Sequence, residues 1–205
     1  MDFCTRVLTK REDAPEFEEF AAMMRDGHPY CRLRIESEGE NGWESLLLAG
    51  EDEAEIAVIE RLPVSFGSSG EDEISDLLEE ARGARPESAL HWIEEYLDEV
   101  RTVYVFHPFY GADTEEGSAA IHALRNFLWE RGEAIMQADH EGFTNEEGHH
   151  ILWQFADTVS GAWSVAVLEE DTWASFTMDL GDPEQREHFL NGEIPPDAIG
   201  LRRHS

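Results

Sequence analysis

The chain has 205 residues, of which 46 are acidic and 15 are lysine or arginine, so its formal net charge is −31. This charge excludes nucleic acids and anionic membranes as ordinary electrostatic partners, because both are polyanions. No apolar run approaches the roughly 18 residues of a membrane span, and no signal segment opens the sequence, so we expect a cytoplasmic protein. A basic protein partner, a cationic ligand or adaptation to high salt is compatible with the acidity.

The first third of the chain carries strand signals around one helix signal. Asp13 and Glu16 form a capping-box spacing, which predicts a helix start at Asp13. An apolar stripe of helical period then runs from Phe17 to Met24, and Gly27 ends it. Strands are expected at Phe3–Thr9, Tyr30–Glu36, Trp43–Ala49 and Glu55–Leu62, with a short helix as the alternative for the last.

Helix signals dominate the middle of the chain. After a linker-like stretch at 65–70, apolar stripes predict helices over 74–81 and from Pro86 to Val100. The apolar run Thr102–Phe109 predicts a central strand, and a further helix is expected over Ser118–Arg131. Near the end, Asp182 is expected to cap a last helix. The remaining tail is expected to be irregular, with Arg202 and Arg203 folded back on the acidic body.

Two consecutive β-hairpins are predicted between Ala134 and Leu180. In the first, a turn at 145–148 would pair Thr144 with His149 and Gly142 with Ile151. Alternation would then place Trp153 on the inner face, whereas Gln137, Asp139, Glu141, His150 and Gln154 would lie on an outer polar face.

The second hairpin has the more consistent pattern. A turn at Glu170 and Asp171 would pair Val167 with Ala174, and the pairing would continue along both strands. The inner face is then wholly apolar, and the reverse face carries Trp173 beside the acidic tip.

These elements predict an α+β protein of antiparallel sheets with helices packed on one face. The order of elements also suggests two similar βαβββ(β)α units, over residues 3–82 and 102–191. We expect an N-terminal half at 1–85 and a C-terminal half at 86–205, joined as one compact unit.

No pattern of residues indicates catalysis, a metal or a cofactor. His149 and His150 are adjacent on a predicted strand and would point to opposite faces, so they cannot ligate one ion together. Asp139 and Glu141 could form an acid–base pair on one face, but such pairs arise by chance in so acidic a chain. Neither a serine elbow, a phosphate loop nor a cysteine–histidine motif is present.

The outer faces of the two hairpins instead suggest a binding surface. An aromatic side chain surrounded by carboxylates suits a basic protein, since the ring supplies apolar contact and the acids steer the encounter. The alternative for Trp173 is that it packs under another element. The candidate partner-binding residues are Asp139, Glu141, His150, Glu169, Glu170, Asp171 and Trp173.

Residues 104–153 resemble immunity-type proteins of bacterial polymorphic-toxin loci. The shared features are a strand–helix unit followed by a hairpin that carries Gln137, Asp139, Glu141, Gly142, Phe143, Gly148, Ile151 and Leu152. The resemblance implies a non-enzymatic inhibitor that neutralises a toxin by binding it. It assigns no binding residue, because such interfaces vary.

We therefore expect a non-enzymatic acidic protein that binds a basic protein partner, such as a toxin. A second hypothesis is a small-ligand-binding domain or enzyme with a carboxylate-lined groove, which would use His107 together with Asp139, Glu141 and His150. A third is a protein whose acidity reflects only adaptation to salt. The oligomeric state is not specified by the sequence.

Overall fold

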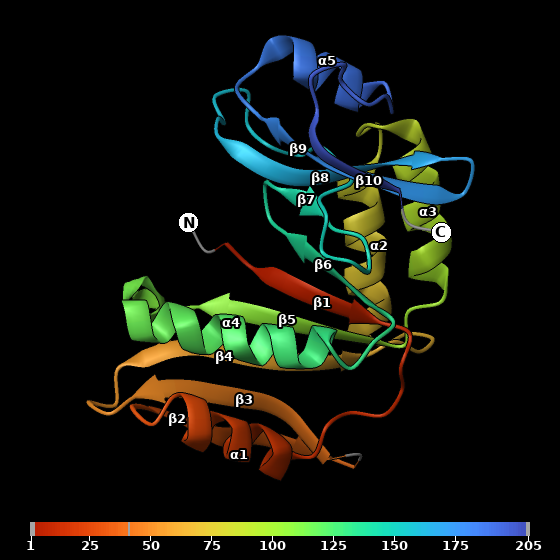
Figure 1. The fold of residues 1–205 in the computed structure, drawn as a ribbon. Coiled ribbons are helices and arrows are strands. Elements are labelled where there is room, and N and C mark those ends of the chain that lie inside the picture. The colour runs from red at the N-terminus through yellow and green to blue at the C-terminus, as the bar shows by residue number, and fades with distance from the viewer. Residues whose placement is uncertain (1–2, 41, 204–205) are drawn as a thin grey trace. The chain divides into compact units, whose positions relative to one another are not determined.

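A computed structural model describes residues 3–40 and 42–203 and confirms the α+β class. In this part of the chain there are five α-helices, a seven-stranded sheet and a three-stranded sheet (Figure 1). The chain forms two compact units, each built from two separate stretches: residues up to Glu73 with Val100–Ala134, and Ile74–Glu99 with residues from Ile135 onward. The predicted division between residues 85 and 86 falls inside a stretch of the second unit.

Five antiparallel strands form the sheet of the first unit, in the order β2-β3-β4-β5-β1. The apolar run in β5 explains its central place, because side chains on both of its faces are buried. The strands are β1 (Thr5–Thr9), β2 (Cys31–Gly39), β3 (Gly42–Gly50), β4 (Glu55–Pro63) and β5 (Thr102–Pro108), so all five predicted strands are confirmed. The helical alternative for the fourth is wrong.

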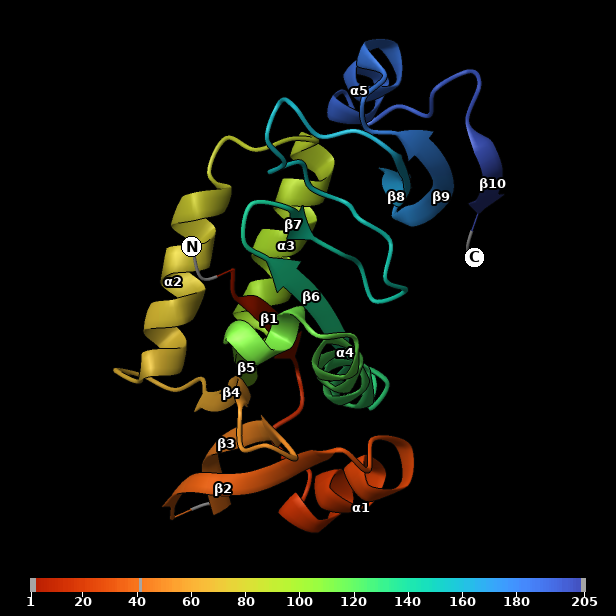
Figure 2. The same ribbon diagram turned by 90° about the vertical axis from the view of Figure 1, so that its left-hand side faces the viewer.

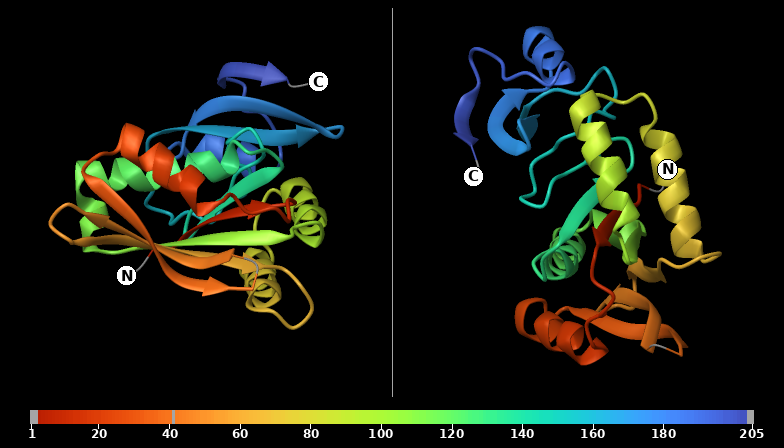
Figure 3. Two further views of the ribbon diagram at one scale, coloured as in Figure 1. Left: turned by 90° about the horizontal axis from the view of Figure 1, so that it is seen from below. Right: turned by 90° about the vertical axis from the view of Figure 1, so that its right-hand side faces the viewer.

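Helices α1 (Phe17–Gly27) and α4 (Glu115–Trp129) lie on the same face of this sheet (Figure 3). The short helix η1 (Tyr110–Asp113) leads into α4. The predicted cap at Asp13 is wrong: Glu16 precedes α1 without a side-chain cap, and the Asp13 carboxylate instead pairs with Arg11 and Arg131. Pairing with the Arg11 guanidinium lowers the pKa of Asp13, so this carboxylate acts in an ion pair before the helix and not as its cap.

The second unit combines helices with two short sheet segments. Its helices are most of α2 (Ser69–Ala81), all of α3 (Glu87–Asp98) and α5 (Pro183–Leu190). Its strands are β7 (Gly142–Phe143), β8 (Ala162–Glu169), β9 (Thr172–Asp179) and β10 (Ile199–Arg203). Strand β6 (Ala134–Ala138) begins at the last residue of the first unit. Strands β6 and β7 are the remaining members of the seven-stranded sheet.

The predicted register of the first hairpin is wrong. A tight turn at 139–141 pairs Ala138 with Gly142, and Thr144 then bridges to His150 rather than to His149. The loop from 145 to 149 has five residues instead of four, because the Asn145 side chain accepts hydrogen bonds from the backbone N–H groups of Glu147 and His149. A shift of one residue exchanges the two faces of a strand.

The predicted register of the second hairpin is confirmed at every pair. Strand β8 pairs with β9 through Val167 and Ala174, Val165 and Phe176, and Trp163 and Met178. The turn residues Glu170 and Asp171 have φ values of 46° and 68°, the backbone that a two-residue hairpin turn requires. The inner face packs on Leu180 and Phe189, with Trp153 and Trp163 partly buried against the same cluster.

The predicted irregular tail is wrong in part. Residues 199–203 form β10, an antiparallel strand at the edge of β9 in the three-stranded sheet β10-β9-β8 (Figure 2). Every residue of β10 is exposed, and its two apolar residues, Ile199 and Leu201, form too short a pattern to indicate a strand. None of the helices described over 3–40 and 42–203 is long and apolar enough to cross a bilayer.

We predict that Gly142→Ala destabilises the protein more than Gly132→Ala does. Both glycines have positive φ, 113° and 90°, which costs a residue with a side chain about 1–3 kcal/mol. A Cβ at Gly142 would also lie 2.3 Å from the carbonyl oxygen of Leu152, whereas one at Gly132 meets nothing within 4 Å. Urea denaturation should give a free-energy loss for Gly142→Ala that exceeds the loss for Gly132→Ala by about 1–3 kcal/mol. Equal losses would contradict the close packing at Gly142.

Candidate functional site

The β8–β9 turn forms an acidic tip, which we define as Glu169, Glu170 and Asp171. Glu170 and Asp171 are exposed in the turn, and Glu169 is the last residue of β8 and half-buried. The Arg203 Nε donates to the Glu169 Oε2 at 2.9 Å, so the chain's own C-terminal strand places a guanidinium on this tip. The predicted fold-back of the terminal arginines is therefore observed for Arg203.

Strand β10 covers the edge of β9 without burying side chains of its own. Its apolar residues Ile199 and Leu201 are 72% and 41% exposed. Its pairing with β9 is interrupted by an irregularity between Ile199 and Arg202, where Gly200 has a φ of 72°. Backbone pairing and the Arg203–Glu169 contact therefore hold this strand, rather than an apolar core.

The two other predicted acids, Asp139 and Glu141, do not lie on a flat strand face. They occupy the turn between β6 and β7, where Glu141 N donates to the carbonyl of Ala138 and His140 has a φ of 62°. Asp139 is half-buried and Glu141 is exposed. The expectation of a carboxylate pair at strand spacing is therefore wrong, because an additional turn at 139–141 interrupts the predicted strand.

His150 is buried rather than outward facing, which corrects its predicted place on a polar surface. It is 3% exposed, and its backbone bridges to β8 through hydrogen bonds with Ser164 and Ala166. Its ring packs 4.6 Å from the ring of Phe155 and 5.8 Å from that of Trp163. Burial among these rings lowers the pKa of His150 to about 4, and its Nε2 has no hydrogen-bond partner. His150 therefore belongs to the core of this unit.

Trp173 packs against α3, as the alternative interpretation proposed. Its ring lies 5.2 Å from that of Trp92 in an edge-to-face arrangement, and its side chain is half-buried. Tight packing between two indoles stabilises the hairpin against the helix. The surface that Trp173 offers to a partner is therefore smaller than the sequence pattern suggested.

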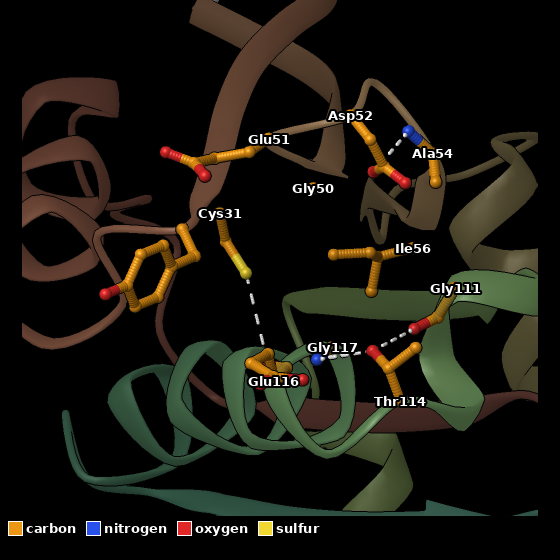
Figure 4. A pocket seen from close by; sticks show the side chains of 11 residues that line it. Cys31, Gly50, Glu51, Asp52, Ala54, Ile56, Gly111, Thr114, Glu116 and Gly117 are labelled. Atoms are coloured by element: carbon orange, nitrogen blue, oxygen red, sulfur yellow. Dashed lines mark hydrogen bonds between the residues drawn. The ribbon is translucent and has the colours of Figure 1, made fainter.

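The first unit contains a pocket of about 390 Å³ (Figure 4). Glu51, Asp52 and Glu116 contribute carboxyl groups to its lining, and Cys31 points toward its centre. Burial raises the pKa of the Cys31 thiol, and the Glu116 carboxylate raises it further, so this thiol stays protonated at neutral pH. None of the predicted groove residues Asp139, Glu141, His107 and His150 lines this pocket.

A series of three interacting polar side chains in the first unit was not predicted from the sequence. Cys4 Sγ lies 3.3 Å from His107 Nδ1, and His107 Nε2 lies 2.8 Å from Glu60 Oε2. The three residues come from segments far apart in sequence. Cys4 and His107, for example, are separated by 103 residues. Only the pairing of β1 with β5, and of β5 with β4, brings them together.

Comparison with protein-family models, with curated proteins and with solved structures gives no match. Within residues 3–40 and 42–203, no group of three or more His, Cys, Asp or Glu side chains is arranged to hold a metal ion.

We predict that burial of His150 makes stability fall as the pH is lowered. Its pKa is about 4 in the folded chain against an ordinary 6.5, so the unfolded chain takes up the proton first. The stability that His150 contributes is fully present above pH 6.5 and is lost as the pH falls toward 4, by about 3 kcal/mol in total. In urea denaturation, His150→Phe should flatten the dependence between pH 6.5 and 5.

A matched control is His91→Phe, at an exposed position of α3. This variant should keep the pH dependence of the original chain. If His150→Phe keeps it as well, the buried imidazole is not the source of the dependence.

Proposed function

We propose that this chain is a cytoplasmic binding protein that engages an extended basic segment of a partner protein at the acidic tip and the edge of β9. The proposed surface includes Glu169, Glu170 and Asp171 from the predicted residues. Asp139 and Glu141 lie outside the tip and add to the negative electrostatic field. His150 is not part of the proposed surface because it is buried. Trp173 is not part of it either, because its ring packs against Trp92.

One observation carries the proposal: this surface already accepts an arginine presented by a strand. Arg203 comes from β10, whose backbone pairs with β9, and its guanidinium meets Glu169 at 2.9 Å. A partner strand added at the same edge would present alternate side chains to the same carboxylates. The mode of recognition is therefore strand addition with charge complementarity.

The chain's own strand is held weakly enough to be exchanged. The Arg203 and Glu169 side chains are 61% and 41% exposed, and exposed ion pairs contribute only about 0–1 kcal/mol. Ile199 and Leu201 remain 72% and 41% exposed, so burial of their apolar side chains holds the strand only in part. A partner with more positive charge, or with apolar side chains that find contacts, can displace β10.

The charge of the whole chain favours the same kind of partner. With a net charge of −31, the protein attracts cationic proteins over long range and repels anionic ones. Such steering raises the association rate and makes it fall with ionic strength. The resemblance of residues 104–153 to immunity-type proteins makes a basic toxin the first partner to test.

We predict that the labelled peptide Ile-Gly-Leu-Arg-Arg, which copies β10, binds the full-length protein and that neutralising the acidic tip weakens this binding. The triple change Glu169→Gln, Glu170→Gln and Asp171→Asn should raise the dissociation constant about tenfold at low salt, since each exposed pair contributes up to about 1 kcal/mol. Fluorescence anisotropy measures the constant. Binding should also weaken steeply between about 50 and 150 mM salt, as the Debye length shortens.

The matched control removes the same amount of charge elsewhere in the same unit. Glu94→Gln, Glu95→Gln and Asp98→Asn lie on exposed positions of α3 and should change the dissociation constant less than twofold. If the control weakens binding as much as the tip variant, only net charge matters, and adaptation to salt becomes the better explanation of the acidity. A peptide with glutamates in place of both arginines should not bind.

A further inference from the structure

Antiparallel pairing places Cys4, His107 and Glu60 on one face of the first unit's sheet. Thr5 pairs with Phe106, so one further step along β1 brings Cys4 opposite His107. On the other side of β5, Glu60 pairs with Val105. Glu60 is thus a diagonal neighbour of His107, a separation of about 7–8 Å that long side chains can bridge. The central position of β5 therefore puts His107 between a thiol and a carboxylate.

The contacts follow the order that activates a nucleophile. Cys4 Sγ lies 3.3 Å from His107 Nδ1, within range for a sulfur hydrogen bond, and Glu60 Oε2 lies 2.8 Å from the other ring nitrogen. A carboxylate on Nε2 holds the proton there, leaving Nδ1 to accept the thiol proton. A nucleophile, a base and a group that orients the base are thus arranged in sequence.

None of the three side chains is fully buried. Cys4 is half-buried, and the side chains of His107 and Glu60 are 38% and 45% exposed. The other cysteine, Cys31, is 7% exposed, and its raised pKa keeps it protonated. The two thiols of one chain therefore differ in access and in the presence of a base.

We propose that Cys4, His107 and Glu60 form a nucleophilic thiol site that hydrolyses small carboxylic esters whose acyl group is uncharged or cationic. This activity is separate from the proposed binding function, and it revises the expectation of a non-enzymatic protein. Cys4 and His107 are the catalytic residues, and Glu60 is a positioning residue.

The reaction proceeds in two balanced steps. In the first, His107 Nδ1 takes the thiol proton, Cys4 Sγ bonds to the acyl carbon, the bond from that carbon to the alcohol oxygen breaks, and the proton passes to the leaving alcohol. In the second, His107 takes a proton from water, the hydroxide oxygen bonds to the acyl carbon, the carbon–sulfur bond breaks, and the proton returns to Cys4. The products are a carboxylic acid and an alcohol, with no change in oxidation state.

Neighbouring charges set the preference among esters. Glu60 adjoins the site, and on the same strand face Arg6 is ion-paired with Glu73, so its charge is largely balanced. The net charge of the chain adds a negative field. An anionic acyl group is therefore repelled, whereas an uncharged one is not.

The test uses the full-length protein and p-nitrophenyl acetate. Release of p-nitrophenolate should be accompanied by acetylation of Cys4, located by mass spectrometry of peptides. Cys4→Ser should abolish both signals, and Cys31→Ser should leave both unchanged. His107→Gln should slow acetylation about a hundredfold. p-Nitrophenyl hydrogen succinate, which is anionic, should react more slowly than the acetate.

A conservative variant separates positioning by Glu60 from a merely structural role. Glu60→Gln keeps an oxygen that can accept a hydrogen bond from His107 Nε2, whereas Glu60→Ala removes it, so Glu60→Gln should retain more of the acetylation rate than Glu60→Ala. Circular dichroism confirms that each variant is folded, and equal rates in the two folded variants would show that Glu60 does not position the ring. Should His107→Gln fail to fold, alkylation of the original chain by iodoacetamide still decides, because Cys4 must react faster than Cys31.

The proposal is overturned by any of three results. The first is hydrolysis that persists in Cys4→Ser, and the second is acetylation of a folded His107→Gln variant at the original rate. The third is a Cys4 that alkylates no faster than Cys31. These results leave the binding of the basic peptide untouched, so the two proposals fail or stand separately.

Discussion

The hydrogen bonds between β1 and β5 join Thr5–Thr9 to Thr102–Phe106, far along the chain, and much of the first unit depends on them. They bring Cys4 to His107, 103 residues away, and they complete a sheet whose central strand has apolar side chains on both faces. Because side chains alternate along a strand, the pairing also fixes which residues share a face. The proposed thiol site thus depends on this register.

Register likewise explains what the sequence could predict and what it could not. In the β8–β9 hairpin, the apolar faces of both strands agree with a two-residue turn at Glu170 and Asp171, so only one pairing satisfies both signals. In the first hairpin, the side chain of Asn145 lengthens the loop by one residue and exchanges the faces. His150 consequently moves from the expected surface into the core, where it loses access to a partner.

The missed features share a different cause. No local pattern relates Cys4 to His107 and Glu60, because tertiary pairing alone makes them neighbours. Strand β10 has no buried face, and its five residues include only two apolar side chains, too few to indicate a strand in the sequence. Its place is set by the open backbone groups of β9 and by the acidic tip. Helices and core strands, in contrast, follow from their own apolar periodicity, which predicted where each lies, although the predicted starts of α1 and α2 differ from the observed ones by several residues.

The interleaving of the two compact units affects how the chain is synthesised and dissected. The first unit needs Val100–Ala134 as well as residues up to Glu73, so the intervening stretch Ile74–Glu99 leaves the ribosome before either unit is complete. A single cut anywhere in the sequence therefore cannot yield both units whole. Terminal truncation, the usual way to isolate a module, would here leave a stretch of the other unit attached: a chain ending at Ala134 keeps the whole first unit together with Ile74–Glu99.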